Sequence, residues 1–279
     1  MSDFAARARA ACMPMRELFP PTPLLRNDYL SQKFGADIWL KREDLSPVRS
    51  YKIRGAFNAM RKQLDRVPEG RAFVCASAGN HAQGVAFACR HFGVQGTIFM
   101  PVTTPQQKIM KTRSFGAEHV TIQLIGDTFD QSLAAAQAFC TERGAHFLSP
   151  FDDEDVIEGQ ASVAVEMLEQ LDHAPDMVVL PVGGGGLSAG MTSYLAQTAP
   201  DSALRYVEPL GGASLQAALR AGEPVTLPRI DSFVDGASVA RIGARTFARL
   251  KHVDPDHVLI APENRICITM LDLLNVEGL

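Results

Sequence analysis

Short apolar runs alternate along the chain with longer segments whose apolar residues recur every three or four positions. The first pattern predicts buried strands and the second predicts amphipathic helices. Strands are expected at 38–40, 73–75, 97–100, 120–124, 146–148, 177–181, 204–207 and 258–260. Helices are expected at 54–63, 82–91, 105–115, 128–143, 156–171, 187–197, 214–221, 241–251 and 264–274. This order predicts an α/β fold with mostly parallel sheets flanked by helices.

Composition narrows the class of protein. Hydrophobic residues make up 46% and charged residues 21% of the 279 residues, which excludes a disordered chain. A net charge of −4 gives no reason to expect a nucleic-acid partner. The five cysteines are scattered, which argues against a disulfide framework or a zinc site and favours a cytoplasmic location.

The longest uncharged run lies between Asp176 and Asp201. It is long enough to cross a membrane, but it contains Pro181 and four consecutive glycines. A strand, a glycine loop and a helix explain it better, so we expect no membrane span.

Ligands of parallel sheets bind at the carboxyl ends of strands, so the loops after strands are the places to look for chemistry. The loop 182–188 contains Gly183, Gly184, Gly185 and Gly186 and opens a helix. Glycines let backbone N–H groups approach an anion, and a helix N-terminus favours negative charge, so a phosphate is the expected ligand. A tight turn without ligand is the alternative. A dinucleotide fingerprint is another, with Glu208 as its acidic residue.

A second loop, 50–56, places Lys52 among small and apolar residues at a helix start. Burial and the helix dipole both favour loss of its charge there. A neutral amine is what Schiff-base chemistry requires. A solvated lysine remains the alternative.

A third loop, 76–81, joins a strand to a helix. Ser77 and the backbone N–H groups suit a carboxylate, and Asn80 can donate to a phenolate-type oxygen. The alternative is that Ser77 or Asn80 caps the helix. His81 is read as structural rather than as a base.

The three loops together resemble the fold-type II pyridoxal-phosphate family, and within it the biosynthetic threonine dehydratases. The matching segments are 41–45, 50–56, 77–84, 181–187, 207–209, 233–239 and 241–243. The resemblance implies a two-domain, tryptophan synthase β-like fold. Its large cofactor-binding domain would use 1–65 and 144–279, and its small substrate-loop domain 66–143.

The resemblance also implies roles for single residues. Lys52 would bind pyridoxal 5′-phosphate covalently and move protons at the substrate. The cofactor phosphate would be held by Gly183, Gly184, Gly185, Gly186 and Leu187, and its ring oxygen by Asn80. The substrate carboxylate would be surrounded by Ser77, Ala78, Gly79 and His81. Phe57 or Tyr51 would flank the ring.

The implied reaction converts L-threonine to 2-oxobutanoate and ammonia, the first step of isoleucine biosynthesis, with L-serine as a possible second substrate. A degradative serine/threonine dehydratase and a serine racemase are the alternatives. Similar racemases carry a second serine where this chain has Ala78, which cannot transfer a proton, so elimination is favoured. No metal is expected, because Ser214 stands where racemases often place an aspartate beside Glu208.

The resemblance stops at Leu279, where family members continue with a further core strand and a serine that bonds the pyridine nitrogen. A C-terminally truncated enzyme without a regulatory domain is therefore expected. A non-catalytic cofactor-binding remnant is the alternative from another class. Family members usually assemble, so a homo-oligomer is expected.

Overall fold

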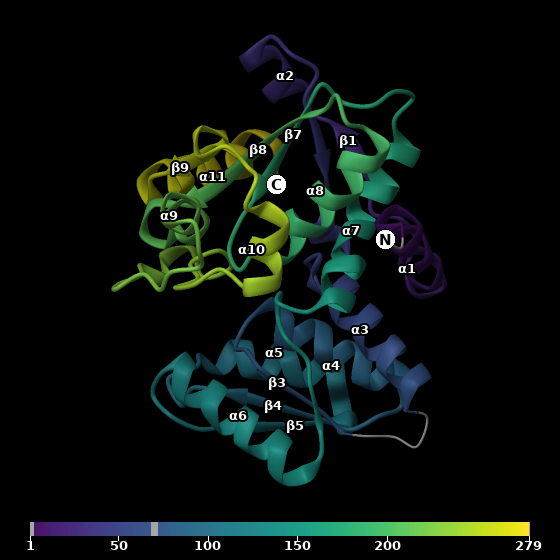
Figure 1. Ribbon diagram of the computed structural model, residues 1–279, viewed down its shortest axis with the longest axis vertical. Coiled ribbons are helices and arrows are strands. Elements are labelled where there is room, and N and C mark those ends of the chain that lie inside the picture. Colours follow the sequence, from purple (N-terminus) through teal and green to yellow (C-terminus); the bar gives the residue numbers. More distant parts are fainter. Residues whose placement is uncertain (1–2, 68–71, 279) are drawn as a thin grey trace.

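The computed structural model describes residues 3–67 and 72–278. Figure 1 shows two groups of strands, one in the lower part of the molecule and one in the upper part, with helices between them. The lower sheet has the order β5-β4-β3-β6 and the upper one β7-β8-β9, and every pairing in both is parallel. The predicted α/β fold with mostly parallel sheets is confirmed.

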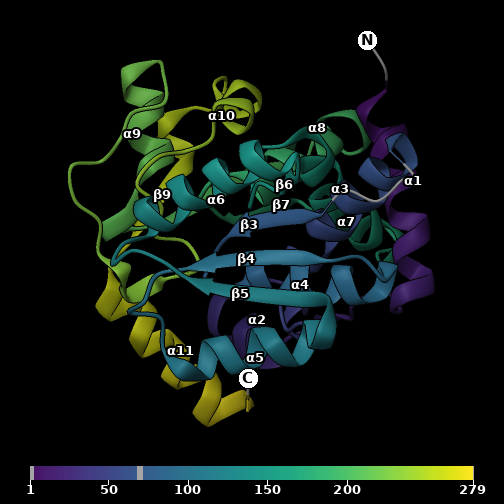
Figure 2. The ribbon, with the colours of Figure 1, turned by 90° about the horizontal axis from the view of Figure 1, so that it is seen from below.

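The strands of the lower sheet are β3 (Phe73–Ala76), β4 (Gly96–Met100), β5 (Val120–Leu124) and β6 (His146–Phe147). Figure 2 shows α6 (Phe129–Arg143) on one face of this sheet, with α4 (Asn80–Phe92) and α5 (Gln106–Gly116) on the other. All four residues of β3 are buried, because helices cover this strand on both faces.

The upper sheet consists of β7 (Met177–Pro181), β8 (Ala203–Pro209) and β9 (Val258–Ala261). Its β7 buries Val178 and Leu180 and exposes Met177 and Val179. One face of β7 therefore packs on the core, where α8 (Gly186–Thr198) follows directly.

Helices α3 (Lys52–Arg66) and α7 (Glu154–Gln170) lie between the two sheets (Figure 1). They approach closely at Gly159, where an added Cβ would lie 2.5 Å from the Arg54 carbonyl oxygen. On its other side α7 meets α8 at Gly190, whose Cβ would lie 2.4 Å from the Ile157 carbonyl oxygen. Small residues thus permit the central helices to pack backbone to backbone.

Several elements were not predicted from the sequence. They are α1 (Phe4–Leu18), β1 (Leu24–Arg26) and α2 (Asp28–Phe34). The strand β1 pairs antiparallel with β2 (Trp39–Lys41), the one predicted strand that lies outside the parallel sheets. A largely buried ion cluster secures this region, because the fully buried Arg54 guanidinium binds Glu43 and Glu166 at 2.7–2.8 Å.

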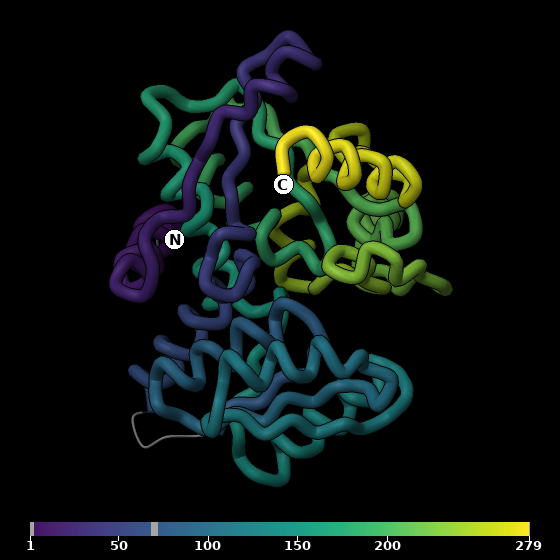
Figure 3. The backbone as a smooth tube through the Cα atoms, turned by 180° about the vertical axis from the view of Figure 1, so that it is seen from behind, coloured from purple at the N-terminus to yellow at the C-terminus, as the bar shows by residue number. Residues whose placement is uncertain are grey.

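The remaining helices are α9 (Ser214–Ala221), α10 (Ala244–Leu250) and α11 (Glu263–Glu277). No described residue of α11 is buried, and Ile268, Leu271 and Leu274 are exposed apolar residues. Figure 3 shows α11 in yellow near the chain's first strands, and Asn27 donates to Glu277 there at 2.9 Å. None of the helices in the described ranges is both long and apolar enough to span a membrane.

The division into a large and a small domain stays a prediction. The four-stranded sheet includes β6 at His146–Phe147, beyond the range 66–143 assigned to the small domain. We propose that the boundary follows β6, where the chain enters the segment 148–153 that leads to α7.

Candidate active site

Lys52 is the first residue of α3, as the sequence predicts for a helix start. Its backbone lies against α4, because a Cβ on Gly84 would lie 3.1 Å from the Lys52 carbonyl carbon. The Lys52 ammonium group donates to the Pro150 carbonyl oxygen at 2.9 Å. The side chain is therefore held toward the segment that links the two sheets.

Burial lowers the pKa of Lys52 to about 8. A buried ammonium loses water that a carbonyl oxygen replaces only in part, so the neutral amine is favoured. The nitrogen also lies 5.6 Å from the centre of the Tyr51 ring. The result is an amine that is partly neutral near neutral pH and able to act as a nucleophile or base.

The four glycines form the turn from β7 into α8. Gly185 has φ +89°, a left-handed conformation that favours glycine, and it directly precedes α8, whose start has no side-chain cap. A Cβ on Gly184 would lie 2.1 Å from the ring of Phe151. The first N–H groups of a helix have no partner within the helix, so this buried N-terminus can bind an anion.

The loop Ser77–Gly79 joins β3 to α4, and Asn80 is the first residue of that helix. The Ser77 hydroxyl accepts from the Gly79 N–H at 3.2 Å. No side chain caps α4, so the alternative in which Ser77 or Asn80 is the helix cap is wrong. The exposed Asn80 amide is available to another ligand.

His81 is buried at 3% exposure and its Nε2–H donates to the Leu148 carbonyl oxygen at 3.0 Å. Burial, and then the charge on Lys52, lower its pKa to about 3. A neutral imidazole bonded to the backbone fits the structural role expected from the sequence better than that of a base.

One short segment brings the three loops together. Leu148 contacts His81, Pro150 contacts Lys52, and the Phe151 ring lies against the glycine turn. The segment connects β6 to α7 and so lies between the sheets. Sequence reasoning missed Pro150 and Phe151; their place directly after a strand end of the parallel sheet was the available signal.

Phe57 and Glu208, two further residues considered from the sequence, lie in other surroundings. Phe57 stacks on Phe92 with ring centres 5.0 Å apart and packs in a hydrophobic cluster with Val48 and Ile53. Glu208 is fully buried and accepts N–H groups of Leu215 and Gln216 at 2.7 and 2.9 Å, with burial raising its pKa to about 7. Its carboxylate thus caps α9, which leaves it unsuited to bind a ribose and argues against the dinucleotide alternative.

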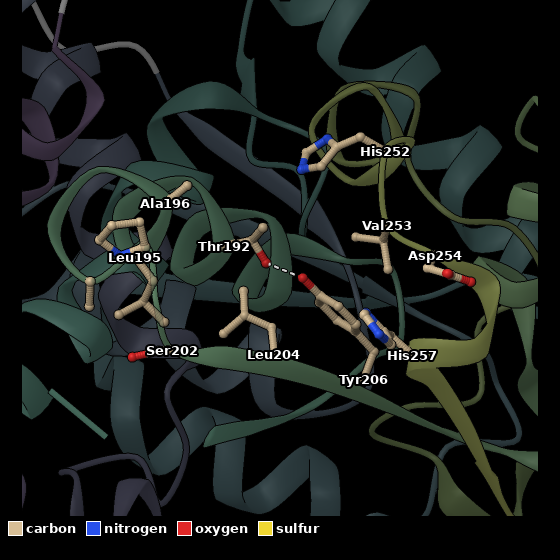
Figure 4. A pocket seen from close by; sticks show the side chains of 12 residues that line it. Thr192, Leu195, Ala196, Ser202, Leu204, Tyr206, His252, Val253, Asp254 and His257 are labelled. Carbon is tan, nitrogen blue, oxygen red and sulfur yellow. Dashed lines mark hydrogen bonds between the residues drawn. The ribbon is translucent and has the colours of Figure 1, made fainter. Parts of the chain in front are cut away.

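A cavity of about 290 Å³ lies apart from these loops, between the end of α8, β8 and the segment after α10. Figure 4 shows Thr192 and Tyr206 pointing toward one another at its wall. Their hydroxyl groups are hydrogen-bonded, with the oxygens 2.8 Å apart. None of the predicted site residues lines it.

The sequence of this chain is similar to those of biosynthetic threonine dehydratases. Biosynthetic L-threonine dehydratases of Bacillus subtilis and Corynebacterium glutamicum are 48% and 45% identical to it, over 91% and 99% of this chain. The chain spans 60% and 64% of the length of these two relatives.

Solved structures agree with the sequence comparison. The processed form of threonine deaminase isoform 2 from Solanum lycopersicum matches with a TM-score of 0.89 and 36% identity, covering 99% of this chain and 79% of that one. Maize serine racemase matches with a TM-score of 0.91 and 25% identity, covering 98% and 81%. A family model described as pyridoxal-phosphate dependent enzyme matches residues 15–279. The chain therefore belongs to the family of pyridoxal-phosphate-dependent enzymes.

Proposed function

We propose that this chain carries the cofactor and substrate site of a threonine ammonia-lyase, which converts L-threonine to 2-oxobutanoate and ammonia. The observation that carries the proposal is the juxtaposition of a Lys52 amine of pKa about 8 and a glycine turn at a helix N-terminus, both against the segment 148–151. The choice of L-threonine as substrate rests on the relatives at 45–48% identity, which are named as threonine dehydratases.

The residues fit pyridoxal 5′-phosphate. Gly183 to Leu187 offer the N–H groups of an uncapped helix start to the phosphate, and Lys52 offers its amine to the aldehyde. Asn80 would bond the ring oxygen. When bound, the cofactor supplies an electron sink that stabilises negative charge on the substrate's α-carbon.

The chain's own groups handle binding and proton transfer. Ser77, Ala78, Gly79 and His81 would surround the substrate carboxylate at the N-terminus of α4. Lys52 would take the α-proton once its amine is free. The β-hydroxyl leaves with one proton as water, and hydrolysis then takes up one water and releases ammonia, so the atoms balance.

Serine racemisation is the second candidate, because maize serine racemase has the same fold over 98% of this chain. Racemisation needs a second acid or base on the opposite face of the α-carbon. The loop offers Ala78 between Ser77 and Gly79, and a methyl group cannot carry a proton. We therefore favour elimination.

The test is the reaction of the purified chain with pyridoxal phosphate, with Lys52→Ala and the exposed-surface variant Lys33→Ala compared. We expect a visible absorption band that is absent in Lys52→Ala and retained in Lys33→Ala. Borohydride should reduce the C=N bond to Lys52, which abolishes the band and leaves the cofactor irreversibly attached to this residue. Attachment should accelerate as the pH rises through about 8, because only the neutral amine attacks. A band retained in Lys52→Ala contradicts the assignment.

Incubation with L-threonine then separates the remaining candidates. Release of 2-oxobutanoate supports the lyase. If the cofactor attaches to Lys52 but no keto acid forms, the chain is a non-catalytic cofactor-binding remnant. If L-serine is converted to D-serine as fast as to pyruvate, the racemase is supported.

A further inference from the structure

The beginning of α10 lies against the glycine turn. Thr246 is fully buried, and its hydroxyl donates to the Gly184 carbonyl oxygen at 2.8 Å and lies 3.0 Å from the Gly243 carbonyl oxygen. The Gly243 N–H also points to the Gly184 carbonyl oxygen, at 3.4 Å. One carbonyl of the turn is thus held by two donors, one from the first turn of α10 and one from the residue that precedes the helix.

This contact sets the direction of an N–H group. The Gly184 carbonyl and the Gly185 N–H belong to one planar peptide, and in a trans peptide the two point in opposite directions. When Thr246 holds the carbonyl toward α10, the Gly185 N–H is turned away from α10. A Cβ on Gly185 would lie 2.9 Å from the Thr246 hydroxyl, so residue 185 must be small as well as left-handed.

Asp152 in turn holds α10. Its carboxylate accepts the N–H groups of Ala244, Arg245 and Thr246 at 3.0, 2.7 and 3.2 Å. An anionic cap on three N–H groups fixes the first turn of this helix firmly. Asp152 directly follows Phe151, whose ring lies on Gly184. Residues 151–152 therefore contact the glycine turn directly through Phe151 and act on it indirectly through Asp152 and α10.

We propose that Thr246 and Asp152 are positioning residues that preset the glycine turn for the cofactor phosphate. Asp152 fixes the start of α10, Thr246 on that turn fixes the Gly184–Gly185 peptide, and the peptide presents its N–H to the anion. This inference rests on the proposed function, in which the turn binds phosphate.

The test compares the affinity of the full chain for pyridoxal phosphate with its affinity for pyridoxal, which lacks the phosphate. The variants are Thr246→Val, which removes the hydroxyl at similar volume, and Thr246→Ser, which restores it. Thr192→Val is the matched control, because Thr192 is also a buried threonine whose hydroxyl is bonded, but to Tyr206 (Figure 4).

Thr246→Val is expected to weaken the binding of pyridoxal phosphate about tenfold, equivalent to about 1.4 kcal/mol, while the affinity for pyridoxal changes less than twofold. Thr246→Ser should recover most of the loss, and Thr192→Val should leave both affinities unchanged. An equal loss for both ligands, or no loss for either, overturns the proposal.

Two further outcomes separate this inference from the proposed function. A wild-type chain that binds pyridoxal as tightly as pyridoxal phosphate shows that the turn holds no phosphate, and the proposed function fails. If Thr246→Val still binds pyridoxal phosphate more tightly than pyridoxal by the same factor as the wild type, only the positioning role is overturned. Asp152→Asn gives an independent reading through α10, with the preference expected to fall at least threefold and an unchanged preference counting against Asp152.

Discussion

At the scale of single residues, burial acts on two basic groups in the same direction. Lys52 and His81 both lie beside backbone carbonyls of the segment 148–150, and each has a lowered pKa because it has lost water. A carbonyl oxygen compensates a buried positive charge less well than a carboxylate does. The site therefore keeps both side chains closer to neutrality than they are in water.

His81 should make the folded state sensitive to acid. Its pKa is about 3 in the folded chain and near 6.5 when exposed, so between these values the unfolded chain binds a proton that the folded chain does not. The contribution of the neutral His81 to the free energy of unfolding is therefore fully present above about pH 6.5 and is lost as the pH falls. The loss is about 2 kcal/mol between pH 7 and pH 5.

Urea unfolding of wild type and His81→Gln at these two pH values measures the effect. The variant should lose less stability on acidification, since it lacks the titrating ring. His173→Gln, which changes an exposed histidine, serves as control and should follow the wild type. A wild type and His81→Gln that lose equal stability would contradict the assignment.

The sequence could predict which loops form the candidate site, but only part of what surrounds them. The glycines and residues 77–81 follow strand ends of the parallel sheets, and this rule requires no three-dimensional information. Lys52 is different, because it lies at the start of α3 after the antiparallel strand β2, and only its local sequence pointed to it. Asp152 and Thr246 are 94 positions apart and meet only through the packing of α10 on the turn. No local pattern distinguishes them from an ordinary acidic residue and an ordinary helical threonine.

At the scale of elements, local pattern predicted the strands most accurately. β5 and β7 begin and end where the sequence predicts. β5 alternates apolar and polar residues, and β7 is an apolar run that starts after Asp176 and ends just before the glycine turn. α1 was missed although Phe4, Ala8, Ala11 and Met15 are buried at helical spacing. Its buried face is built largely from alanines, which give a weak hydrophobic signal, and Pro14 within the helix weakens it further.

The packing of α7 on α3 depends on the absence of one methyl group. In Gly159→Ala the new Cβ would lie 2.5 Å from the Arg54 carbonyl oxygen and 2.8 Å from the Gly55 Cα, both backbone atoms. Overpacking costs about 1–3 kcal/mol, and the better helix propensity of alanine returns only about 1 kcal/mol. We expect a net loss of about 1 kcal/mol, and at most about 2 kcal/mol, because the backbone cannot turn aside as a side chain can.

The unfolding midpoint in urea measures this loss. The matched control is Gly236→Ala, where no atom lies within 4 Å of the added Cβ. Alanine there restricts the unfolded chain and should leave stability unchanged or raise it by about 0.5 kcal/mol. Equal midpoints for the two variants would show that the helices have room to separate.

At the scale of the whole molecule, the segment 148–153 joins the two sheets and contacts all three candidate loops. Leu148 to Phe151 contact these loops, while Asp152 caps α10 and Asp153 caps α7 through the N–H groups of Asp155 and Val156. The residues that line the candidate site therefore also form one of the links between the two sheets.

Arg54 provides the complementary connection on the far side of Lys52. Its guanidinium, fully buried, donates to Glu43, to Glu166, and to the Thr22 hydroxyl at 3.2 Å, which joins α3 to α7 and to the N-terminal segment. Two carboxylates share one guanidinium and the nearby Lys41 ammonium, which binds Glu166 at 2.7 Å. The cluster is stable only while its charges remain balanced.

Removing Arg54 should therefore cost far more than removing an exposed arginine. Arg54→Met keeps much of the side-chain volume but leaves Glu43 and Glu166 without their main partner, and we expect a loss of about 3–5 kcal/mol in urea unfolding. Arg54→Lys should not restore the stability, because an ammonium group cannot bind two carboxylates with the planar geometry of a guanidinium. Arg26→Met removes an arginine that pairs with Asp28 and Asp37 at the surface, and its unfolding midpoint should match the wild type. If Arg54→Met unfolds at the same urea concentration as Arg26→Met, the buried cluster does not hold these segments together, and the apolar packing of α3 on α7 must carry that connection alone.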